Sequence, residues 1–398
     1  MPRILRILNR LAVGGPVLNA TYLTRYLSPE YETVLVVGEK EDHEQSAAYL
    51  ADKLGIEYVT IKGMGRSINP AGDYKAYREL QKLIRKFRPD IVHTHAAKPG
   101  ALGRLAAASA KVPVILHTFH GHVFHSYFGN VKSRVFINAE RYLASKSDAI
   151  IAISHQQKKE LVEDFRIAPE HKFHVVPLGF DLDRFRTDYD EKRRQFRLEF
   201  QVDDDTIAIG IIGRLVPVKN HALFIRALRY VLDHTDRKVK AFIIGDGASR
   251  SQLEELSRQA GIGFTNEHTR QHDQPLVFTS WRSDVDVINA GLDIVCLTSF
   301  NEGTPVSLIE AQAANNPIVS TRVGGIADIV SEGSTALLAG VQEEELFGDH
   351  LLRLVQDDEL RHRLGHNSSL HVIEKFSYQR LVRDMAQLYE MLMASKKC

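Results

Sequence analysis

Short apolar runs alternate with longer amphipathic stretches through the first 180 residues of the chain. The runs are almost continuous in Val, Ile and Leu, and the stretches between them space their apolar residues as a helix does. A strand that is apolar on both faces belongs to a parallel sheet covered by helices on both sides. The pattern therefore predicts a doubly wound α/β domain over residues 1–180. Its expected strands lie at 4–8, 33–38, 56–61, 91–95, 113–121, 149–154 and 173–179.

A second series of the same kind follows a charged stretch at 181–205, which has no strand signal and is interpreted as a linker. The series predicts another doubly wound domain over 206–375, and the polar residues 376–398 have a helical pattern. Two such domains joined by a linker predict a cleft that the carboxyl ends of both sheets face. The expected strands are 206–213, 239–247, 274–280, 292–299, 316–325 and 335–340.

The composition is that of a soluble globular protein with two cores. The chain has 398 residues, of which 44% are hydrophobic and 25% charged. Arg3, Arg6 and Arg10 interrupt the apolar residues at the start, and 18 apolar residues never run together, so neither a signal peptide nor a membrane span is expected. Cys296 and Cys398 suggest neither a disulfide framework nor a zinc site. The cytoplasm is the expected compartment.

The formal net charge of +1 hides an asymmetry between the two halves of the chain. Residues 1–180 hold 25 Lys and Arg against 17 Asp and Glu, a balance of +8, and the remainder holds 26 against 33, a balance of −7. The run 74–89 places basic side chains between apolar residues at helical spacing. Such a helix can contact an anionic membrane, or it can pack its apolar face on the sheet and solvate its charges. The first interpretation adds the inner face of a membrane as an expected partner.

Two glutamates, Glu302 and Glu310, stand eight positions apart in the stretch 300–312, which follows a predicted strand. Thr304 is the expected N-cap and Pro305 the expected first residue of the helix that follows. The free N–H groups of a helix start attract anions, whereas carboxylates are good acceptors for sugar hydroxyls. The arrangement indicates a ligand that carries both phosphate and sugar. The plainer interpretation is one glutamate in a turn and another on a solvated helix face.

Arg214 and Lys219 lie in the loop after the first predicted strand of the second domain. A guanidinium and an ammonium that converge there suit a diphosphate leaving group, although two surface bases beside a proline turn would look the same. In the first domain Gly14 and Gly15 occupy the matching loop, where glycines let backbone N–H groups approach a ligand closely. The loop reads GGPVLNA rather than G-x-G-x-x-G, so the dinucleotide fingerprint is absent.

Four histidines, His117, His120, His122 and His125, gather at the end of the predicted strand 113–121. Because no cysteine or nearby carboxylate completes a zinc ligand set, a metal site is not expected. A single histidine beside a glycine, at the carboxyl edge of a strand, is better placed to contact a ligand in the cleft. Several of the four are expected to be structural.

Together these motifs resemble those of the retaining glycosyltransferases of family 4, whose GT-B fold has two Rossmann-like domains facing a central cleft. The similarity runs from residue 4 to about residue 389, and the order and spacing of five motifs make it specific. Within the family the chain is most similar to bacterial enzymes that build surface polysaccharides. The motifs are Gly14-Gly15, Thr118-Phe119-His120-Gly121, Gly213-Arg214 with Lys219, Gly245-Asp246-Gly247, and Glu302 with Glu310.

The resemblance implies a role for each matching position. Glu310 would hold the nucleotide ribose, Glu302 the hydroxyls of the donor sugar, and His120 the transferred sugar near its reacting carbon. Arg214 and Lys219 would stabilise the departing diphosphate, so that no metal or other cofactor is required. The final helix would cross back to the first domain. The implied catalytic residues are His120, Arg214, Lys219 and Glu302, and the implied donor-binding residues are Gly14, Gly15, Gly213, Arg214, Lys219, Gly245, Trp281, Arg282, Glu302, Gly303, Thr304, Pro305 and Glu310.

The implied reaction moves a hexosyl or N-acetylhexosaminyl group from a nucleotide-diphosphate donor, preferably a UDP-sugar, to a glycan or lipid-linked acceptor. The acceptor would attack from the side on which the diphosphate leaves, so the anomeric configuration is retained. Two departures from the family leave contacts open. Thr304-Pro305-Val306 stands where many members have an aromatic residue and a second glycine, and Pro16 stands where many have a polar or acidic residue.

Other functions remain compatible with the same motifs. A sugar-nucleotide epimerase of GT-B-like fold would bind the same donor and need no acceptor. A non-catalytic subunit would keep the donor site without turnover, although the chain retains every charged motif position. A nicotinamide oxidoreductase agrees with Glu39 at the end of the second strand but not with the glycine pattern. Product formation that depends on an acceptor separates transfer from the first two, and cofactor absorbance tests the third.

Overall fold

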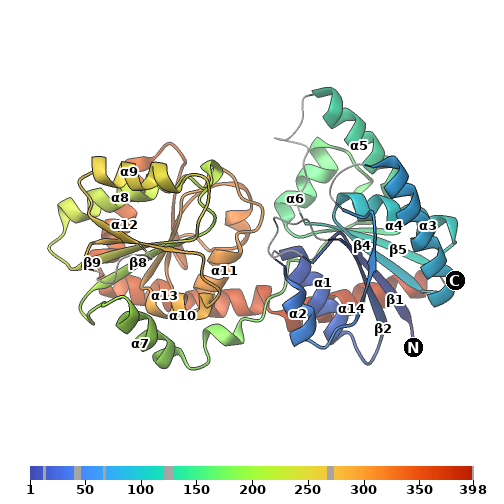
Figure 1. Cartoon of the computed structure of the whole chain (residues 1–398), viewed down its shortest axis with the longest axis horizontal. Coiled ribbons are helices and arrows are strands. Elements are labelled where there is room, and N and C mark those ends of the chain that lie inside the picture. Colours follow the sequence, from blue (N-terminus) through green and yellow to red (C-terminus); the bar gives the residue numbers. More distant parts are fainter. Residues whose placement is uncertain (12–14, 40–45, 66–68, 121–129, 267–272, 397–398) are drawn as a thin grey trace. The chain divides into compact units, whose positions relative to one another are not determined.

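The computed structural model describes residues 1–11, 15–39, 46–65, 69–120, 130–266 and 273–396. The chain forms two compact units, each with its own sheet and core (Figure 1). The first unit comprises Met1–Phe180 together with Phe376–Cys398, and the second comprises Asp181–Lys375. No helix in the described part of the chain is long and apolar enough to cross a membrane.

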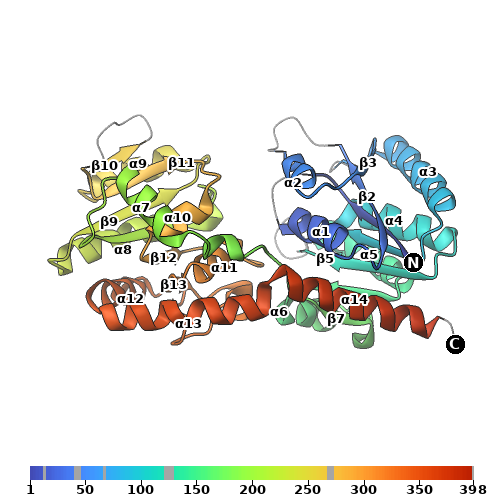
Figure 2. The same ribbon diagram turned by 90° about the horizontal axis from the view of Figure 1, so that it is seen from below.

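The first unit is built on seven parallel strands in the order β3-β2-β1-β4-β5-β6-β7. Helices cover both faces of the sheet, with α1 and α14 on one face and α3 and α4 on the other (Figure 2). The strands are β1 (Arg3–Leu8), β2 (Glu32–Gly38), β3 (Tyr58–Ile61), β4 (Ile91–His95), β5 (Val114–Phe119), β6 (Ala149–Ala152) and β7 (Phe173–Val175). The helices are α1 (Gly15–Tyr26), α2 (Ala48–Lys53), α3 (Pro70–Phe87), α4 (Ala97–Ser109), α5 (Asn130–Ser145), α6 (His155–Lys159) and α14 (Tyr378–Ser395).

Successive residues of the central strands point to opposite faces and are buried on both. Ile4 belongs to the core beneath α1 and α14, and its neighbour Leu5 belongs to the core beneath α3 and α4. Both side chains are fully buried. This double burial is the physical reason for the continuous apolar runs in the sequence, and it confirms the predicted doubly wound α/β fold.

The last helix, α14, completes the first unit. The Ser377 hydroxyl caps it by accepting a hydrogen bond from the Arg380 N–H at 3.4 Å. On either side of the cap, the Phe180 N–H donates to the Phe376 carbonyl at 2.8 Å and the Tyr378 N–H donates to the Phe180 carbonyl at 3.0 Å. One face of the helix then enters the core of the first unit, through Leu381, Met385, Leu388, Tyr389 and Leu392.

The second unit repeats the design with seven parallel strands in the order β10-β11-β9-β8-β12-β13-β14. The strand pattern in the sequence did not predict β10, which has only three residues and lies at the edge of the sheet. The strands are β8 (Ile207–Ile212), β9 (Val239–Ile244), β10 (Phe264–Asn266), β11 (Leu276–Ser280), β12 (Ile294–Leu297), β13 (Ile318–Thr321) and β14 (Ala336–Ala339). The helices are α7 (Tyr189–Glu199), α8 (His221–His234), α9 (Arg250–Gln259), α10 (Val285–Gly291), α11 (Val306–Ala313), α12 (Glu344–Gln356) and α13 (Asp358–Phe376).

The charged stretch 181–205, predicted as a linker, contains helix α7 and lies in the second unit. Phe196 of α7 is fully buried and packs edge-on against Phe242 of β9, with 5.0 Å between the ring centroids. The Arg193 guanidinium binds the Asp293 carboxylate at 2.7 Å. Helix α7 therefore has one apolar face towards the core of the second unit, while its charged residues remain at the surface or form ion pairs.

Candidate functional site

Two loops meet at the carboxyl edge of the sheet in the second unit. Strands β8 and β12 lie side by side, but the chain leaves β8 towards β9 and leaves β12 towards β13. In parallel α/β sheets ligands bind outside the carboxyl ends of strands at such a switch point. The loops after the two strands are joined there, because the Phe300 N–H donates to the Val218 carbonyl at 2.8 Å and the Thr298 hydroxyl donates to the Lys219 carbonyl at 2.9 Å.

A short ion pair joins the same two loops. The Lys219 ammonium, from the 3₁₀ turn η4 (Pro217–Lys219), lies 2.5 Å from Oε1 of Glu302. The Ser299 hydroxyl donates to the same oxygen at 2.6 Å. The two charged side chains are only 20% and 11% exposed. Two donors thus fix Glu302 in place, and two residues from the predicted site, 83 positions apart in the chain, come together.

Helix α11 begins one residue later than predicted. Pro305 occupies the cap position with φ −70° and ψ 102°, and Val306 is the first helical residue. Thr304 is therefore not the N-cap, because the residue after it, Pro305, is extended rather than helical. No side chain caps this helix. The Leu308 N–H donates to the Pro305 carbonyl at 3.2 Å, which leaves the N–H groups of Val306 and Ser307 at the helix start for an anion.

A glycine pair that the sequence reading did not assign to the site packs against the acidic loop. The Gly325 N–H donates to the Glu302 carbonyl at 3.0 Å. A Cβ atom on Gly324, whose φ is +49°, would lie 1.9 Å from that same carbonyl oxygen, and one on Gly325 would lie 1.9 Å from the Gly303 carbonyl. Only glycine permits these contacts. The sequence signal was the Gly-Gly at the end of the run 316–325.

Glu310 lies further along α11 and faces a residue from the predicted linker. The Arg184 guanidinium, in the turn η3 (Asp183–Phe185), lies 3.3 Å from Oε1 of Glu310. The glutamate side chain is 15% exposed. Burial raises the pKa of Glu310 to about 7, and the neighbouring Arg184 opposes the shift. Glu310, the residue implied to hold the ribose, is thus a largely buried carboxyl group with Arg184 as its charged partner. No sequence motif pointed to Arg184 as that partner.

Arg214 differs from the other charged residues of this edge. It follows β8 and is exposed, and its side chain makes no hydrogen bond or ion pair with another described residue. Gly245, in the loop after β9, packs against Gly213, the residue before Arg214. Its φ is +138°, and a Cβ atom there would lie 2.0 Å from the Gly213 carbonyl oxygen. Gly245 therefore permits the loops after β8 and β9 to touch, whereas Gly213 itself could carry a side chain. The guanidinium of Arg214 remains available to an anionic ligand.

Trp281 and Arg282 follow β11 at the same edge but have different surroundings. Trp281 is 59% exposed. The Arg282 guanidinium is bound on both sides, by the Asp284 carboxylate at 2.6 and 2.8 Å and by the Glu199 carboxylate at 3.0 Å. These two partners also raise the pKa of Arg282. Of these two residues, both implied to bind the donor, Trp281 has the accessible side chain, and Arg282 is held in an ion-pair network.

The predicted site residues of the first unit lie partly outside the described residues, namely Gly14, Gly121, His122 and His125. Gly15 is the first residue of α1. His120 directly follows β5 and is held by His95 at the end of β4, with 2.8 Å between Nε2 of His120 and Nδ1 of His95. His117 is structural, as expected for several of the histidines, because it is buried and bonds to the Thr94 hydroxyl at 2.9 Å.

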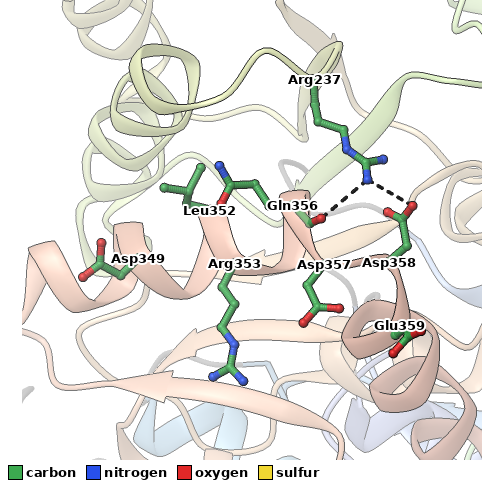
Figure 3. Close-up of a pocket in the computed structure, with 8 residues that line it drawn as sticks. All are labelled: Arg237, Asp349, Leu352, Arg353, Gln356, Asp357, Asp358 and Glu359. Carbon is green, nitrogen blue, oxygen red and sulfur yellow. Dashed lines mark hydrogen bonds and ion pairs between the residues drawn. The ribbon is translucent and has the colours of Figure 1, made fainter.

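A hollow elsewhere in the second unit has no part in this site. It has a volume of about 500 Å³ and lies where α12 meets α13 (Figure 3). Arg237, which precedes β9, binds the Asp358 carboxylate there at 3.1 Å. Because Arg237 stands before its strand, this hollow is at the amino edge of the sheet, away from the loops described above. Among the residues that the structure describes, no group of three or more His, Cys, Asp or Glu side chains could hold a metal ion.

Two family models together match nearly the whole chain. The model "Glycosyltransferase Family 4" matches residues 13–184, and the model "Glycosyl transferases group 1" matches residues 192–371. The chain is 30% identical to a D-inositol 3-phosphate glycosyltransferase of Corynebacterium jeikeium, over 76% of this chain and 72% of the relative. It is 26% identical to the UDP-Gal:alpha-D-GlcNAc-diphosphoundecaprenol alpha-1,3-galactosyltransferase of Escherichia coli, over 87% of each chain.

Solved structures match the fold over almost its full length. The HepE protein of Anabaena, crystallised with UDP, matches with a TM-score of 0.80 and 16% identity over 98% of this chain and 100% of that one. A glycosyltransferase from Rickettsia africae matches with a TM-score of 0.80 and 20% identity over 98% of each chain. The two parallel-sheet units are those of the GT-B fold.

Proposed function

The chain belongs to glycosyltransferase family 4, and from this premise we propose that it transfers a sugar, with retention of configuration, from a UDP-sugar to a glycan or lipid-linked acceptor of a surface polysaccharide. It is a glycosyltransferase with homologues in surface polysaccharide synthesis, such as the capsular polysaccharide glycosyltransferase CapM of Staphylococcus aureus. The donor, the stereochemistry and the acceptor are the parts that we propose. The name of the Escherichia coli relative, with its UDP-galactose donor and its lipid-linked acceptor, supports this choice.

The observation that carries the proposal is the charge arrangement at the carboxyl edge of the second unit. Arg214 is exposed and has no partner among the described residues, Lys219 lies 2.5 Å from Glu302, and the N-terminus of α11 has no side-chain cap. A diphosphate that gains negative charge as it leaves needs fixed positive groups of this kind. We assign Arg214, Lys219 and the first N–H groups of α11 to that diphosphate.

The acidic residues suit the sugars of the donor. Glu302 is held by two donors on one oxygen, so its other oxygen can accept hydrogen bonds from sugar hydroxyls. We assign Glu310 to the ribose hydroxyls, as the family motif implies. The buried position of Glu310 favours hydroxyl groups over water, because a hydrogen bond to a partly buried carboxylate is stronger than one in solvent.

The transfer step that we propose needs only these groups and the two substrates. The bond between the anomeric carbon and the diphosphate oxygen breaks, and its electron pair leaves with the diphosphate. The acceptor hydroxyl forms the new bond from the same side, and its proton passes to a departing phosphate oxygen. Attack on that side retains the configuration. Arg214 and Lys219 supply the positive charge that a metal would otherwise provide, so we expect activity to persist with a chelator present.

Calorimetry with UDP, GDP and ADP, in the absence of metal, is the first test. We expect one nucleotide, UDP, to bind to the wild type and its binding to be lost or strongly weakened in Glu310→Ala. The matched control is Glu359→Ala, which removes a glutamate beside the hollow in Figure 3, at the other edge of the same sheet. If no nucleotide binds, or if Glu310→Ala binds UDP as well as the wild type does, the donor site proposed here is wrong.

The reaction itself is tested with a set of UDP-sugars and lipid-linked acceptors. We expect sugar transfer that requires the acceptor, and a product whose anomeric configuration, read by NMR, equals that of the donor. An inverted product would contradict the proposed mechanism. Conversion of the nucleotide sugar into its epimer without any acceptor would instead support the epimerase alternative.

We also propose that the basic face of α3 contacts an anionic membrane that carries the acceptor. The apolar face of α3 is not available for this contact, because Ala76, Leu80 and Ile84 are buried in the core of the first unit. Between α3 and the edge strand β3 lies an open groove of about 610 Å³, and its charged lining residues are five basic side chains and one acidic one, Glu79. The basic residues are Lys62, Lys75, Arg78, Lys82 and Lys86. An electrostatic contact with anionic headgroups fits this lining better than helix insertion does.

Flotation with liposomes tests the membrane proposal. We expect binding to vesicles that contain phosphatidylglycerol, weaker binding as salt is raised, and no binding to vesicles of phosphatidylcholine alone. The double variant Lys75→Glu/Lys82→Glu should lose the binding. The control Arg353→Glu/Arg363→Glu reverses the same number of charges on exposed residues of the second unit and should keep it. Equal binding of the two double variants would exclude the groove as the contact.

A further inference from the structure

A chain of buried polar side chains in the first unit runs from Arg6 on β1 to His120 at the end of β5. Arg6, His93 and His95 are fully buried, although each carries groups that need hydrogen-bond partners. Tyr389 of α14 joins the chain, since its hydroxyl lies 3.3 Å from both terminal nitrogens of Arg6. Three strands and one helix of a single unit thus contribute to one network, whose proton positions can be worked out from its only permanent donor.

Arg6 determines the tautomer of His93. An arginine donates hydrogen bonds and accepts none. Nδ1 of His93 lies 2.9 Å from a terminal nitrogen of Arg6, so this ring nitrogen must carry the lone pair. The proton of the neutral ring is then on Nε2, which lies 2.7 Å from the Thr118 hydroxyl and donates to it. The Tyr389 hydroxyl, 2.7 Å from Nδ1, can donate to the same lone pair.

The same guanidinium acts on His95. Nε2 of His95 lies 3.5 Å from the terminal nitrogen of Arg6 that contacts His93. A proton on Nε2 would point at the N–H groups of a cation, so the lone pair is favoured there. The proton of His95 is then on Nδ1, which lies 2.8 Å from Nε2 of His120. His95 is therefore the donor in the contact between the two rings, and His120 is the acceptor.

The consequence at His120 is a free donor. With Nε2 occupied as an acceptor, the ring carries its proton on Nδ1. This nitrogen is buried and has no hydrogen-bond partner in the described part of the chain. Burial also lowers the pKa of His120 to about 3, so the ring is neutral at the pH of a cell. Burial likewise lowers the pKa of His95 and of His117, and the positive charges of Arg6 and Arg104, respectively, add to this lowering, so these two rings are neutral as well.

We propose that Arg6, acting through His95, holds His120 in the Nδ1–H tautomer, so that His120 donates a hydrogen bond to an oxygen of the bound substrate and does not serve as a base. Arg6 and His95 are positioning residues in this arrangement. Only the identity of the oxygen, a sugar hydroxyl or ring oxygen, rests on the proposed function. An N–H group that is buried without a partner is costly in the free protein, and a bound sugar oxygen would satisfy it.

The tautomer can be observed without any substrate. Long-range ¹H–¹⁵N correlation NMR of protein labelled at histidine distinguishes a protonated Nδ1 from a protonated Nε2, and the signals of His120 are identified by their loss in His120→Gln. We expect the wild type to show Nδ1–H at His120 at pH 7. A wild-type spectrum with Nε2–H at His120 would overturn the proposal, whether or not the protein proves to be a glycosyltransferase.

Two substitutions at His95 test the cause of the tautomer. In His95→Asn the amide N–H can take the place of Nδ1–H, so we expect His120 to keep its proton on Nδ1. In His95→Leu no donor remains, and we expect His120 to move to Nε2–H or to a mixture of the two. The apolar Leu also keeps the site filled, and circular dichroism verifies that both variants fold. An unchanged tautomer in folded His95→Leu would show that His95 does not set it.

A kinetic comparison links the tautomer to the substrate. We expect His95→Leu to lower kcat about tenfold, which is the value of one hydrogen bond, and His95→Asn to restore most of it. A general loss of folding would change both variants alike. If the NMR result holds but the two variants have equal kcat, the tautomer is real and the substrate contact proposed for His120 is wrong. If Arg6→Met folds, it should give the same spectrum as His95→Leu.

Discussion

The carboxyl edge of the sheet in the first unit is lined by buried, neutral rings, whereas the same edge in the second unit carries charged side chains that solvent partly reaches. The two sheets share a frame of six strands, β3-β2-β1-β4-β5-β6 in the first unit and β11-β9-β8-β12-β13-β14 in the second. The seventh strand lies at opposite edges, as β7 in one sheet and β10 in the other. The same backbone arrangement therefore supports two different kinds of surface.

The difference follows from the partners that each edge provides. In the first unit His95 and His120 bond to each other at 2.8 Å, and burial lowers the pKa of both rings. In the second unit Lys219 and Glu302 face each other as ions, and Arg214 is exposed. Neutral donors suit sugar hydroxyls, and fixed charges suit a phosphate group. If the proposed function is correct, we expect the second unit to be the main source of electrostatic stabilisation during transfer.

The largest expected effect is on catalysis in the second unit. Arg214→Ala should lower kcat by roughly 100-fold to 1,000-fold, because it removes a charge placed at the leaving group. Its thermal midpoint should equal that of the wild type, since Arg214 has no partner among the described residues to lose. Arg353→Ala, beside the hollow at the amino edge of the same sheet, is the control and should change neither quantity. Full turnover in Arg214→Ala would show that the charge comparison does not extend to catalysis.

The next effect is on stability, through Glu310. Its pKa is raised from an ordinary 4.5 to about 7 in the folded protein. Ionising Glu310 therefore lowers the free energy of unfolding by an amount that is zero below pH 4.5 and complete above pH 7. Wild-type stability should therefore fall relative to Glu310→Gln as pH rises from 5 to 8, by up to about 3 kcal/mol. Urea unfolding followed by the fluorescence of Trp281, the one tryptophan of the chain, reports on this unit.

Arg184 provides the matched variant for this measurement. Because Arg184 opposes the rise in the pKa of Glu310, Arg184→Met should raise that pKa further and steepen the fall in stability with pH. Glu310→Gln combined with Arg184→Met should show no such steepening. A pH trend that is the same in the wild type and in Glu310→Gln would contradict the buried, charge-sensitive carboxyl group described here.

The first unit should respond to pH in the opposite direction. Burial lowers the pKa of His120 from 6.5 to about 3, so the neutral ring contributes stability that is complete above pH 6.5 and is lost as pH falls towards 3. Between pH 6.5 and 5 the wild type should lose about 2 kcal/mol relative to His120→Gln, which cannot titrate. Amide hydrogen exchange of β5 measures this unit separately. Equal pH trends in the two proteins would mean that His120 is protonated in the folded state.

The smallest effect is the coupling within the ion pair of the second unit. A double-mutant cycle of Lys219→Met and Glu302→Gln should give a coupling of about 1 kcal/mol in unfolding free energy. The same cycle on Arg226 and Glu344, whose side chains are 44% and 45% exposed, should give a value near zero. Equal values in the two cycles would show that partial burial adds nothing to the pair at the site.

The sequence alone determined the fold class and the family. Continuous apolar runs, separated by stretches with helical spacing, indicate strands that are buried on both faces. This burial is visible in the residue types themselves, without knowing which distant residues pack against them. That is why all but one strand could be predicted and why β10, with three residues at an edge, could not. The loops that carry Arg214, Lys219 and Glu302 were located for the same reason, since each follows a strand.

Only the tertiary structure decided which side chains are partners. Arg184 meets Glu310 across 126 positions of the chain, and Arg6 meets Tyr389 across 383. The sequence likewise could not show that Arg282 is held by carboxylates or that the extended Pro305 delays the start of α11. Hydrogen bonds and pKa shifts depend on neighbours that packing brings together and on the water that it removes, and neither leaves a periodic trace in the order of residues.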